Sequence, residues 1–494
     1  MMQYIKKQIF IAVLSAIAIS GWSQELLNMD RSLEIAISNS PTMKQSELSL
    51  KHSREKLHAQ RARLKSQFKL TFEPISYRKA NQIERSTSNR YLNESAYSLG
   101  RFSVDQRILP TDGVLSLRNT LSYQYNHSES QRDTTTDKYF QNNLNLSLEQ
   151  PLFTYNKTKI ELEKVELSYE DALLRYLLQK LNLEKQVAQN FYQMYLLQMR
   201  LNIASEELKN NKESYGIIKN KVDGGLLALE ELYQAEVNFE SSKSKLYTAE
   251  LNLLDNKDKF KVLIGMPLDN TIEILADVKA DTVDVDPVKA IKHALTSRME
   301  LRQRQIDIKN ARNNLIQARA TNEFEGKLTA SIGLQSENDY FESLFENTAP
   351  TPAVGLSLDI PLFDWGERKS EIRAAEASLK IAEIDHQVEQ VDIEVNIRSV
   401  LRNLQNLENQ IVIQEKTVKN AELTYDINLE RYRNGDLTSL DLGIYQNQLS
   451  DKKMALTNAI IDYKLELLNL KIQTLYDFEL DQPIIPEEIL NKTE

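Results

Sequence analysis

The chain has 494 residues, no cysteine, 27% charged residues and a formal net charge of −10. The absence of cysteine excludes disulfide scaffolds, thiolate metal sites, cysteine nucleophiles and lipidation of an N-terminal cysteine. The acidic balance argues against nucleic acid as a partner, because phosphate binding needs clustered Lys and Arg. Thirteen Gly and eleven Pro are few for this length, and the mean hydropathy is −0.47. These values predict scarce loops and long, solvated helices.

The first 23 residues have the pattern of an export signal. Lys6 and Lys7 precede an apolar run over 9–19, and the small residues Gly21 and Ser23 follow it. Eleven apolar residues are too few for a membrane-spanning helix. Cleavage would remove two positive charges, which changes the net charge from −10 to −12. We therefore expect an exported protein that either stays soluble in the envelope or crosses a membrane as β-strands.

Two copies of one unit follow the signal. Residues 146–153 (LSLEQPLF) match 356–363 (LSLDIPLF) at an offset of 210, and the same offset relates the glycine-containing segments 221–227 and 431–437. Further upstream the offset is 258, so the first copy holds 258 − 210 = 48 extra residues. The chain is therefore a duplication in which one copy is enlarged at a single place, between residues 71 and 146.

Each copy begins with a short helix and a second, longer one. Asp286-Pro287 supplies an N-cap and then Pro at the first helical position of the second copy. Ser40-Pro41 separates the two helices of the first copy, because Pro disfavours helix at the preceding residue. These helices are expected over 29–39, 42–68, 288–297 and 300–326.

Segments with period-two alternation come next and predict β-strands. Leu144, Leu146 and Leu148 alternate with polar residues, as in the wall of a transmembrane β-barrel; a half-buried soluble sheet would alternate in the same way. The 48 extra residues hold two such segments around the turn 110–113, which predicts six strands, four in copy one and two in copy two; the alternative is that these residues form an external or periplasmic hairpin. This turn is expected on the periplasmic side. Polar loops facing the exterior are expected over 80–96, 128–138 and 335–352.

Each copy ends in a long helical hairpin. Two stretches of 69 residues contain no Pro, and each is followed by a break, Asp223-Gly224-Gly225 or Asn434-Gly435, and by a returning helix. A helix of that length would be ~100 Å long. An ordinary coiled-coil spacer is the alternative, although the apolar spacing is not a strict heptad. The hairpin helices are expected over 154–222, 226–264, 364–432 and 436–474.

The pattern divides the chain into a signal peptide, two repeats, a linker and a tail. These segments are 1–23 (signal peptide), 24–268 (first repeat), 269–285 (linker), 286–478 (second repeat) and 479–494 (tail). Within the repeats, helices are expected over 29–68 and 288–326, strands over 69–152 and 327–362, and hairpins over 154–264 and 364–474. No phosphate loop, dinucleotide-binding glycine motif or His-Glu-x-x-His motif is present. The sequence therefore predicts no catalytic residue, cofactor or metal.

The order of these features resembles the TolC-like outer-membrane efflux protein family over 28–478, with Pro-Leu-Phe at both strand-to-helix junctions. Met299 stands where that family has Pro. The resemblance implies an α+β membrane protein, a homotrimer whose chains close one outer-membrane β-barrel that a long periplasmic α-helical barrel continues. Four to six strands per chain agree with this, because the smallest closed barrels have eight.

The same resemblance implies a passive channel and not an enzyme. Its partners would be a periplasmic adaptor, an inner-membrane efflux pump or ATP-driven exporter, and outer-membrane lipid. It would lie in the outer membrane with a long periplasmic extension. The alternatives are a soluble periplasmic coiled-coil scaffold, which leaves the amphipathic strands without a role, and an envelope enzyme without an identifiable site.

The second tip resembles the family's periplasmic gate. Tyr432 precedes Gly435 by three residues and Asp441 follows it by six, as in the family, whereas Leu437 and Ile444 replace its Arg and second acid. Three Asp441 carboxylates around a narrow pore would attract cations. A solvated helix residue is the alternative for Asp441, and Asp436 would either add an acidic ring or cap the returning helix.

Two further groups of residues complete the prediction. The tips are expected to dock the adaptor, with intersubunit packing as the alternative, through Gly224, Gly225, Leu226, Gly435 and Leu437. Aromatic residues where strands give way to long helices are expected at the membrane interface, with core packing as the alternative; they are Phe153, Tyr155, Phe363 and Trp365.

Overall fold

The computed structural model describes residues 25–83, 90–130, 134–276, 278–279, 282–346, 348–434 and 436–484. The predicted signal peptide, Gly435 and the end of the expected tail lie outside this set. The chain forms two compact units, 1–50, 173–302 and 387–494 in the first, and 51–172 and 303–386 in the second.

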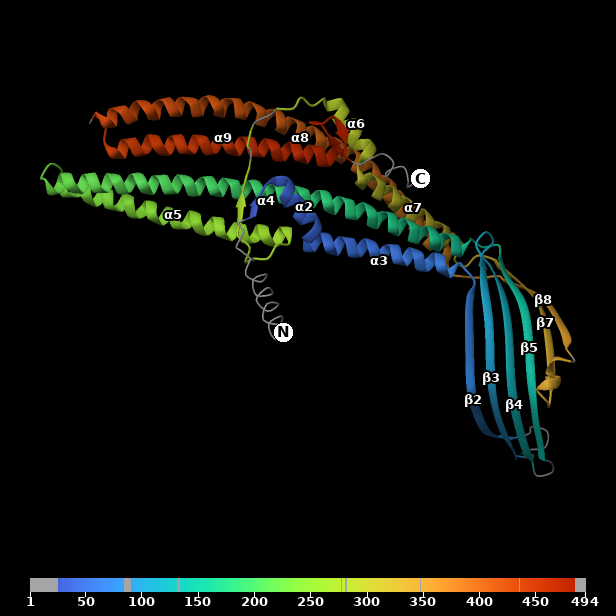
Figure 1. The fold of residues 1–494 in the computed structure, drawn as a ribbon. Coiled ribbons are helices and arrows are strands. Elements are labelled where there is room, and N and C mark those ends of the chain that lie inside the picture. Colours follow the sequence, from blue (N-terminus) through green and yellow to red (C-terminus); the bar gives the residue numbers. More distant parts are fainter. Residues whose placement is uncertain are drawn as a thin grey trace, which may run out of the picture. The chain divides into compact units, whose positions relative to one another are not determined.

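The second unit is built on one antiparallel sheet of six strands in the order β2-β3-β4-β5-β7-β8 (Figure 1). The prediction of four strands from the first copy and two from the second is confirmed. The strands run further than expected, which leaves shorter loops than the predicted 80–96, 128–138 and 335–352. Their bounds are β2 (Gln67–Ile83), β3 (Arg90–Ile108), β4 (Gly113–Ser130), β5 (Thr134–Leu152), β7 (Glu325–Asn338) and β8 (Ala349–Asp359).

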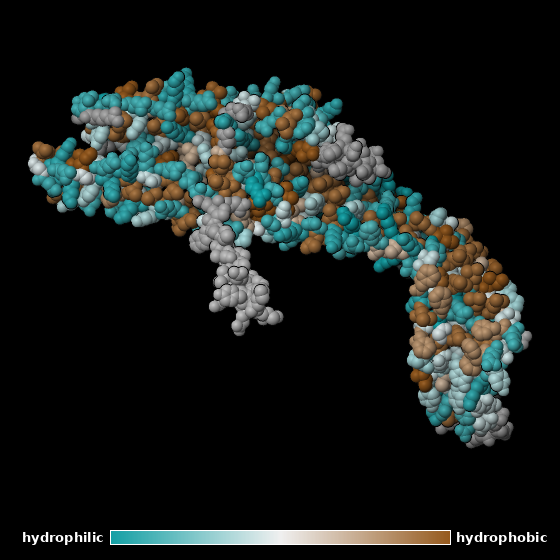
Figure 2. Space-filling model, viewed as in Figure 1, coloured by the Kyte–Doolittle hydropathy of each residue, from teal (hydrophilic) through white to brown (hydrophobic). Residues whose placement is uncertain are grey.

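The pairing register gives this sheet one apolar and one polar face. Leu117 lies level with Leu146, and Leu146 with Ile332 of the second repeat, so that one apolar face runs through both repeats. The whole apolar row is Phe68, Val104, Leu117, Leu146, Ile332 and Pro352. The next row, on the opposite face, is Lys69, Ser103, Arg118, Asn145, Gly333 and Thr351. Figure 2 shows the hydrophobic side chains gathered on the part of the sheet nearest the helices.

The first unit contains two hydrophobic cores, one for each repeat. In the first, Ala36 and Phe260 are completely buried with Val187; in the second, Ala290 and Ile397 are buried with Leu470. The helices of the first repeat are α2 (Met29–Asn39), α3 (Pro41–Arg63), α4 (Lys157–Asp223) and α5 (Leu229–Ile264). Those of the second are α6 (Pro287–Ser297), α7 (Met299–Ala320), α8 (Glu367–Arg433) and α9 (Ser439–Thr474).

Local signals explain where these helices begin and end. Asp286 caps α6 by accepting a hydrogen bond from the Val288 N–H (2.9 Å), as predicted. Gly265 ends α5 with φ +73°, and a Cβ there would lie 2.3 Å from the Asn39 carbonyl oxygen, so this close approach to α2 requires glycine. No helix of the described residues combines the length and the apolar character needed to cross a bilayer.

The expected linker contains a short strand. β6 (Ile272–Ile274) pairs in parallel with β1 (Glu25–Leu27) in a two-stranded sheet. After α9, β9 (Tyr476–Asp477) pairs with β10 (Gln482–Pro483), so the start of the expected tail is folded back on the end of the second repeat. Both small sheets belong to the first unit.

Candidate functional site: helical tips and strand-to-helix junctions

The first tip is a Schellman motif, in which the chain leaves a helix through a left-handed residue. The Leu226 N–H donates to the Lys221 carbonyl (2.8 Å) and the Gly225 N–H donates to the Val222 carbonyl (2.9 Å). Gly225 has φ +69°. Any side chain at Gly225 would therefore strain the backbone, and Gly225 cannot be replaced to test a surface contact without altering the turn itself.

The second tip repeats this geometry where the structure describes it. The Asp436 N–H donates to the Arg431 carbonyl (2.9 Å), the counterpart of the Leu226 bond at the offset of 210. Asp436 is exposed, and the alternative that it caps the returning helix is wrong. The N-cap of α9 is Thr438, two residues later. The pattern Thr-x-x-Asp over 438–441 is the sequence signal that identifies this cap.

Asp441 completes a reciprocal cap with Thr438. The Thr438 hydroxyl donates to Asp441 Oδ2 (2.6 Å) and accepts from the Asp441 N–H (3.2 Å), in the first turn of α9. A carboxylate in that turn is also favoured by the helix dipole. Tyr432 is half-buried in the last turn of α8. No hydrogen bond between Tyr432 and Asp441 is found in the described part of the tip.

The repeat adds one carboxylate that the sequence prediction missed. The offset of 210 places Glu231, in the first turn of α5, at the position of Asp441. Glu231 is exposed, and it lines a groove of about 230 Å³ together with Leu440 and Ile444 of α9. The constant offset by itself was the signal that could have identified Glu231. Asp441 and Glu231 are thus two equivalent acidic positions, one in the first turn of each returning helix.

Leucine side chains at the tips are left open to solvent. Leu226 is 76% exposed and Leu229 is 54% exposed in the first tip, and Leu440 is 57% exposed in the second. Leu437 is half-buried. Such apolar exposure within one described chain is typical of a surface that another protein covers.

The strand-to-helix junction of the first repeat is capped by the inserted hairpin. Asp112, in the turn between β3 and β4, accepts hydrogen bonds from the Lys157 and Thr158 N–H groups of α4 (3.1 Å each). Asn156 accepts from the Lys159 N–H (2.7 Å) and donates to the Leu109 carbonyl (2.6 Å). The turn therefore lies at the end of the sheet where the strands join the helices.

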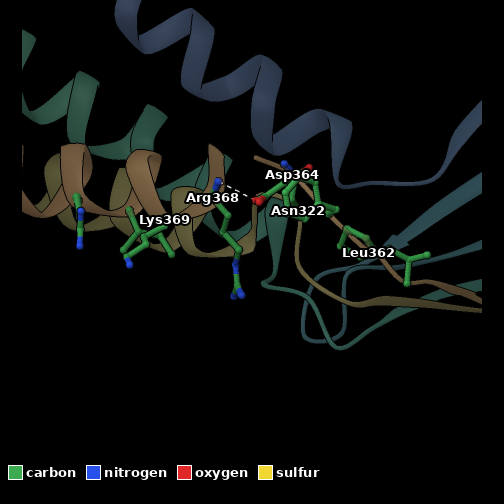
Figure 3. Close-up of a pocket in the computed structure, with 9 residues that line it drawn as sticks. Asn322, Leu362, Asp364, Arg368 and Lys369 are labelled. Carbon is green, nitrogen blue, oxygen red and sulfur yellow. Dashed lines mark hydrogen bonds between the residues drawn. The ribbon is translucent and has the colours of Figure 1, made fainter. Parts of the chain in front are cut away.

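The second junction caps its helix locally. Asp364 accepts from the N–H groups of Arg368 and Gly366 (3.0 Å each), and these bonds hold the pKa of Asp364 below its usual value. The offset of 210 equates Arg368 with Thr158 and Asp364 with Thr154, whose hydroxyl has no partner among the described residues. Asp364, Arg368 and Leu362 line a hollow of about 570 Å³; Figure 3 labels these side chains.

All four predicted interface aromatics lie at these two junctions. Phe153 is 65% exposed with φ +61°, and its ring lies 5.2 Å from that of Phe324. Phe363 and Trp365 are 72% and 90% exposed and meet edge to face at 4.6 Å. Tyr155 is half-buried, with the Lys157 ammonium 6.0 Å from its ring centre. Three of the four are therefore surface residues and do not belong to a core.

Comparisons with known proteins agree with this architecture. The probable outer membrane lipoprotein SilC of Salmonella typhimurium is 23% identical over 372 residues, 73% of this chain and 77% of that protein. The cation efflux system protein CusC of Escherichia coli strain K12 is 22% identical over 377 residues, 73% and 78%. The solved structure of the Campylobacter jejuni CmeC outer membrane channel has a TM-score of 0.69 at 16% identity, covering 94% of this chain and 89% of that one.

The VceC outer membrane protein of Vibrio cholerae has a TM-score of 0.64 at 17% identity, covering 92% of this chain and 97% of its own. The α+β fold of these channels is thus the fold of this chain. The model of the outer membrane efflux protein family matches residues 112–266 and 290–471, more than half of the chain and parts of both repeats. The chain belongs to the outer membrane efflux protein family and is an outer-membrane channel component of an efflux or secretion system, with a long periplasmic helical extension.

Proposed function

We propose that three copies of this chain close one β-barrel and one helical barrel, and that the trimer conducts solutes passively from the periplasm to the exterior. The observation that carries the proposal is the six-stranded amphipathic sheet with two unpaired edges, β2 and β8. Three such sheets would supply 3 × 6 = 18 strands. Barrels of 16 to 18 strands enclose an aqueous channel.

Exposed apolar stripes on the long helices support assembly in the periplasm. Val388, Val391 and Val395 of α8 are 50–60% exposed at spacings of three and four residues. On α5, Leu251 and Leu254 are 61% and 59% exposed. Within a trimer, helices of neighbouring chains would cover these stripes, as ridges pack into grooves between parallel rods.

The tips would carry the gate and the adaptor contact. Asp441, Tyr432 and the exposed Asp436 would line the narrow end of the tunnel. The exposed leucines, with the turns at Gly224 and Gly225 and at Gly435, would contact a periplasmic adaptor. An inner-membrane efflux pump or ATP-driven exporter would supply the energy and select the cargo. The junction aromatics would lie at the periplasmic face of the outer membrane, against lipid.

Cysteine accessibility tests the orientation of the sheet, because the chain has no cysteine of its own. Thr111→Cys lies in the β3–β4 turn and Glu129→Cys near the opposite end of β4; both residues are exposed. A membrane-impermeant maleimide should label Glu129→Cys in intact cells and Thr111→Cys only after the outer membrane is opened. Labelling of Thr111→Cys from outside would contradict the proposed orientation.

Cross-linking tests the oligomeric state. The purified full-length protein in detergent should give a ladder that ends at three chains, and its mass on native electrophoresis should match a trimer. A ladder that ends at two chains would refute the shared barrel. Replacing Val391 by Glu would place a charge in the proposed helix–helix contact and should weaken the trimer, whereas Glu389→Gln on the same helix should not.

A further inference from the structure

The connection between β7 and β8 folds onto the sheet and does not extend from the rim. It contains the 3₁₀ helix η1 (Glu342–Phe345), which contacts β5 and β7. Leu344 is completely buried, and the Phe341 ring packs edge to face on Phe140 at 5.6 Å. The Tyr340 N–H donates to Asn338 Oδ1 (3.0 Å). Residues 339–346, called the β7–β8 lobe below, are therefore a packed element.

The lobe lies on the apolar face of the sheet. Phe140 pairs with Tyr123 across the strands, and their rings are 4.9 Å apart on that face. Asn142 and Ser336, which are paired in register, also point to it and are 7% and 5% exposed. These two polar side chains are thus buried on the strands that the lobe contacts.

The outer surface of the lobe exposes three large aromatic side chains, which a loop in water does not need. Tyr340, Phe341 and Phe345 are 74%, 47% and 58% exposed. The lobe contacts the interior strands β5 and β7, whereas the sheet edges that a second copy would cover are β2 and β8. A neighbouring copy joined at the edges therefore does not account for these rings.

The height of the lobe matches the outer boundary of a bilayer. Along β5, Phe140 lies 152 − 140 = 12 residues from Leu152, which ends the strand at the periplasmic junction. At ~3.3 Å per residue this is ~40 Å along the strand, and at the usual barrel tilt of about 40° it is ~30 Å along the membrane normal. The apolar band of a membrane barrel is ~25 Å tall and has an aromatic girdle at each interface. A height of ~30 Å above the junction therefore places Phe140 and the lobe at the level of the outer girdle.

We propose that the β7–β8 lobe is a lipid anchor, which inserts Tyr340, Phe341 and Phe345 at the boundary between acyl chains and headgroups of the outer leaflet. This rests on the proposed membrane position of the sheet. Tyr340 suits that boundary because its ring is apolar and its hydroxyl is polar, and the Phe341 and Phe345 rings would lie on the acyl-chain side of it. The occupant of the aromatic surface is therefore lipid, and the lobe does not lie over the channel mouth.

Tryptophan quenching in reconstituted vesicles tests the anchor. Trp22 lies in the predicted signal peptide, so Trp365→Phe gives a mature full-length chain without tryptophan. In this background we would compare three single-tryptophan variants, Phe345→Trp in the lobe, Leu146→Trp in the apolar row, and Tyr139→Trp on the polar face. The vesicles would be phosphatidylcholine with bromine near the headgroup end or deep in the acyl chains.

Phe345→Trp should lose most of its emission to shallow bromines and less to deep ones. Leu146→Trp, about halfway between Phe140 and Leu152, should show the reverse order, and Tyr139→Trp should keep its emission. If the emission of Leu146→Trp is quenched and that of Phe345→Trp is not, the lobe is not a lipid anchor, although the sheet still lies in the membrane. A blue-shifted emission of Phe345→Trp in that case would indicate that protein covers the lobe. If neither Phe345→Trp nor Leu146→Trp is quenched, the sheet does not lie in the bilayer and the proposed function is refuted.

Discussion

The hydrogen bonds of Asp112 make a quantitative prediction about how the inserted hairpin stabilises α4. The first N–H groups of a helix have no partner within the helix. At the start of α4, the N–H groups of Lys157 and Thr158 donate to Asp112 of the β3–β4 turn, and the Lys159 N–H donates to Asn156. Losing a capping side chain costs 0.5–2 kcal/mol, and losing a negative charge near the dipole costs a further 0.3–1 kcal/mol. Asp112→Ala should therefore destabilise this helix end by about 2 kcal/mol.

Hydrogen exchange measured by mass spectrometry reports the effect at the helix end itself. A loss of about 2 kcal/mol corresponds to a ~30-fold faster exchange of the Lys157 and Thr158 amides, if they exchange by local opening. Asp112→Asn keeps one acceptor oxygen and tolerates the observed φ of 60°, so we expect ~1 kcal/mol and a ~5-fold change.

Asp364→Ala is the matched control for Asp112→Ala, because Asp364 caps α8 in the second repeat. This substitution should accelerate exchange at Arg368 and leave the start of α4 protected. Unchanged exchange of Lys157 and Thr158 in Asp112→Ala would refute the reasoning, since the hairpin would then sit beside α4 without stabilising it.

Four further substitutions test the tips and the end of the second repeat. Asp441→Asn should reduce the cation selectivity of the purified channel in planar bilayers, and Glu231→Gln should reduce it further if both carboxylates face the tunnel; an unchanged reversal potential in both would remove them from the gate. Leu226→Ser should weaken binding of the cognate adaptor about tenfold and leave the mass of the trimer unchanged. Leu226 is 76% exposed in the chain, and burying a leucine side chain contributes about 1.5–3 kcal/mol. Loss of the trimer would instead make Leu226 an intersubunit residue. Asp477 is disfavoured as an anion by burial, but the Lys471 ammonium (2.6 Å) and two backbone N–H groups hold its pKa below the usual value. Its contribution is therefore present above pH ~4 and is lost as the pH falls through the lowered pKa. Asp477→Asn should cost about 2 kcal/mol in urea unfolding at pH 7, and this cost should shrink as the pH is lowered through the acid range; a cost that stays the same at every acidic pH would contradict the ion pair.

The sequence by itself determined the repeat, the order of the elements and the number of strands. These follow from local rules, namely alternation for strands, Pro-free stretches for long helices, and Ser40-Pro41 and Asp286-Pro287 at helix boundaries. The glycine break at 223–225 also marked the first turn correctly, because a left-handed residue is needed to leave a helix in a Schellman motif, and Gly225 is that residue. Local signals were enough wherever the deciding contacts lie within a few residues.

Only the tertiary structure decided which distant residues meet. Alternation gives each strand two faces but not its partners, and the pairing of β5 with β7 joins the apolar faces of the two repeats. The cap of α4 comes from Asp112, 45 residues away from Lys157, and nothing in the spacing indicates that contact. Residues 339–346 lie within the segment 335–352 that the sequence predicts as a polar rim loop, yet Leu344 is completely buried against the sheet. Such contacts depend on how separate elements pack together, and the residue pattern within one segment of the chain carries no information about that packing.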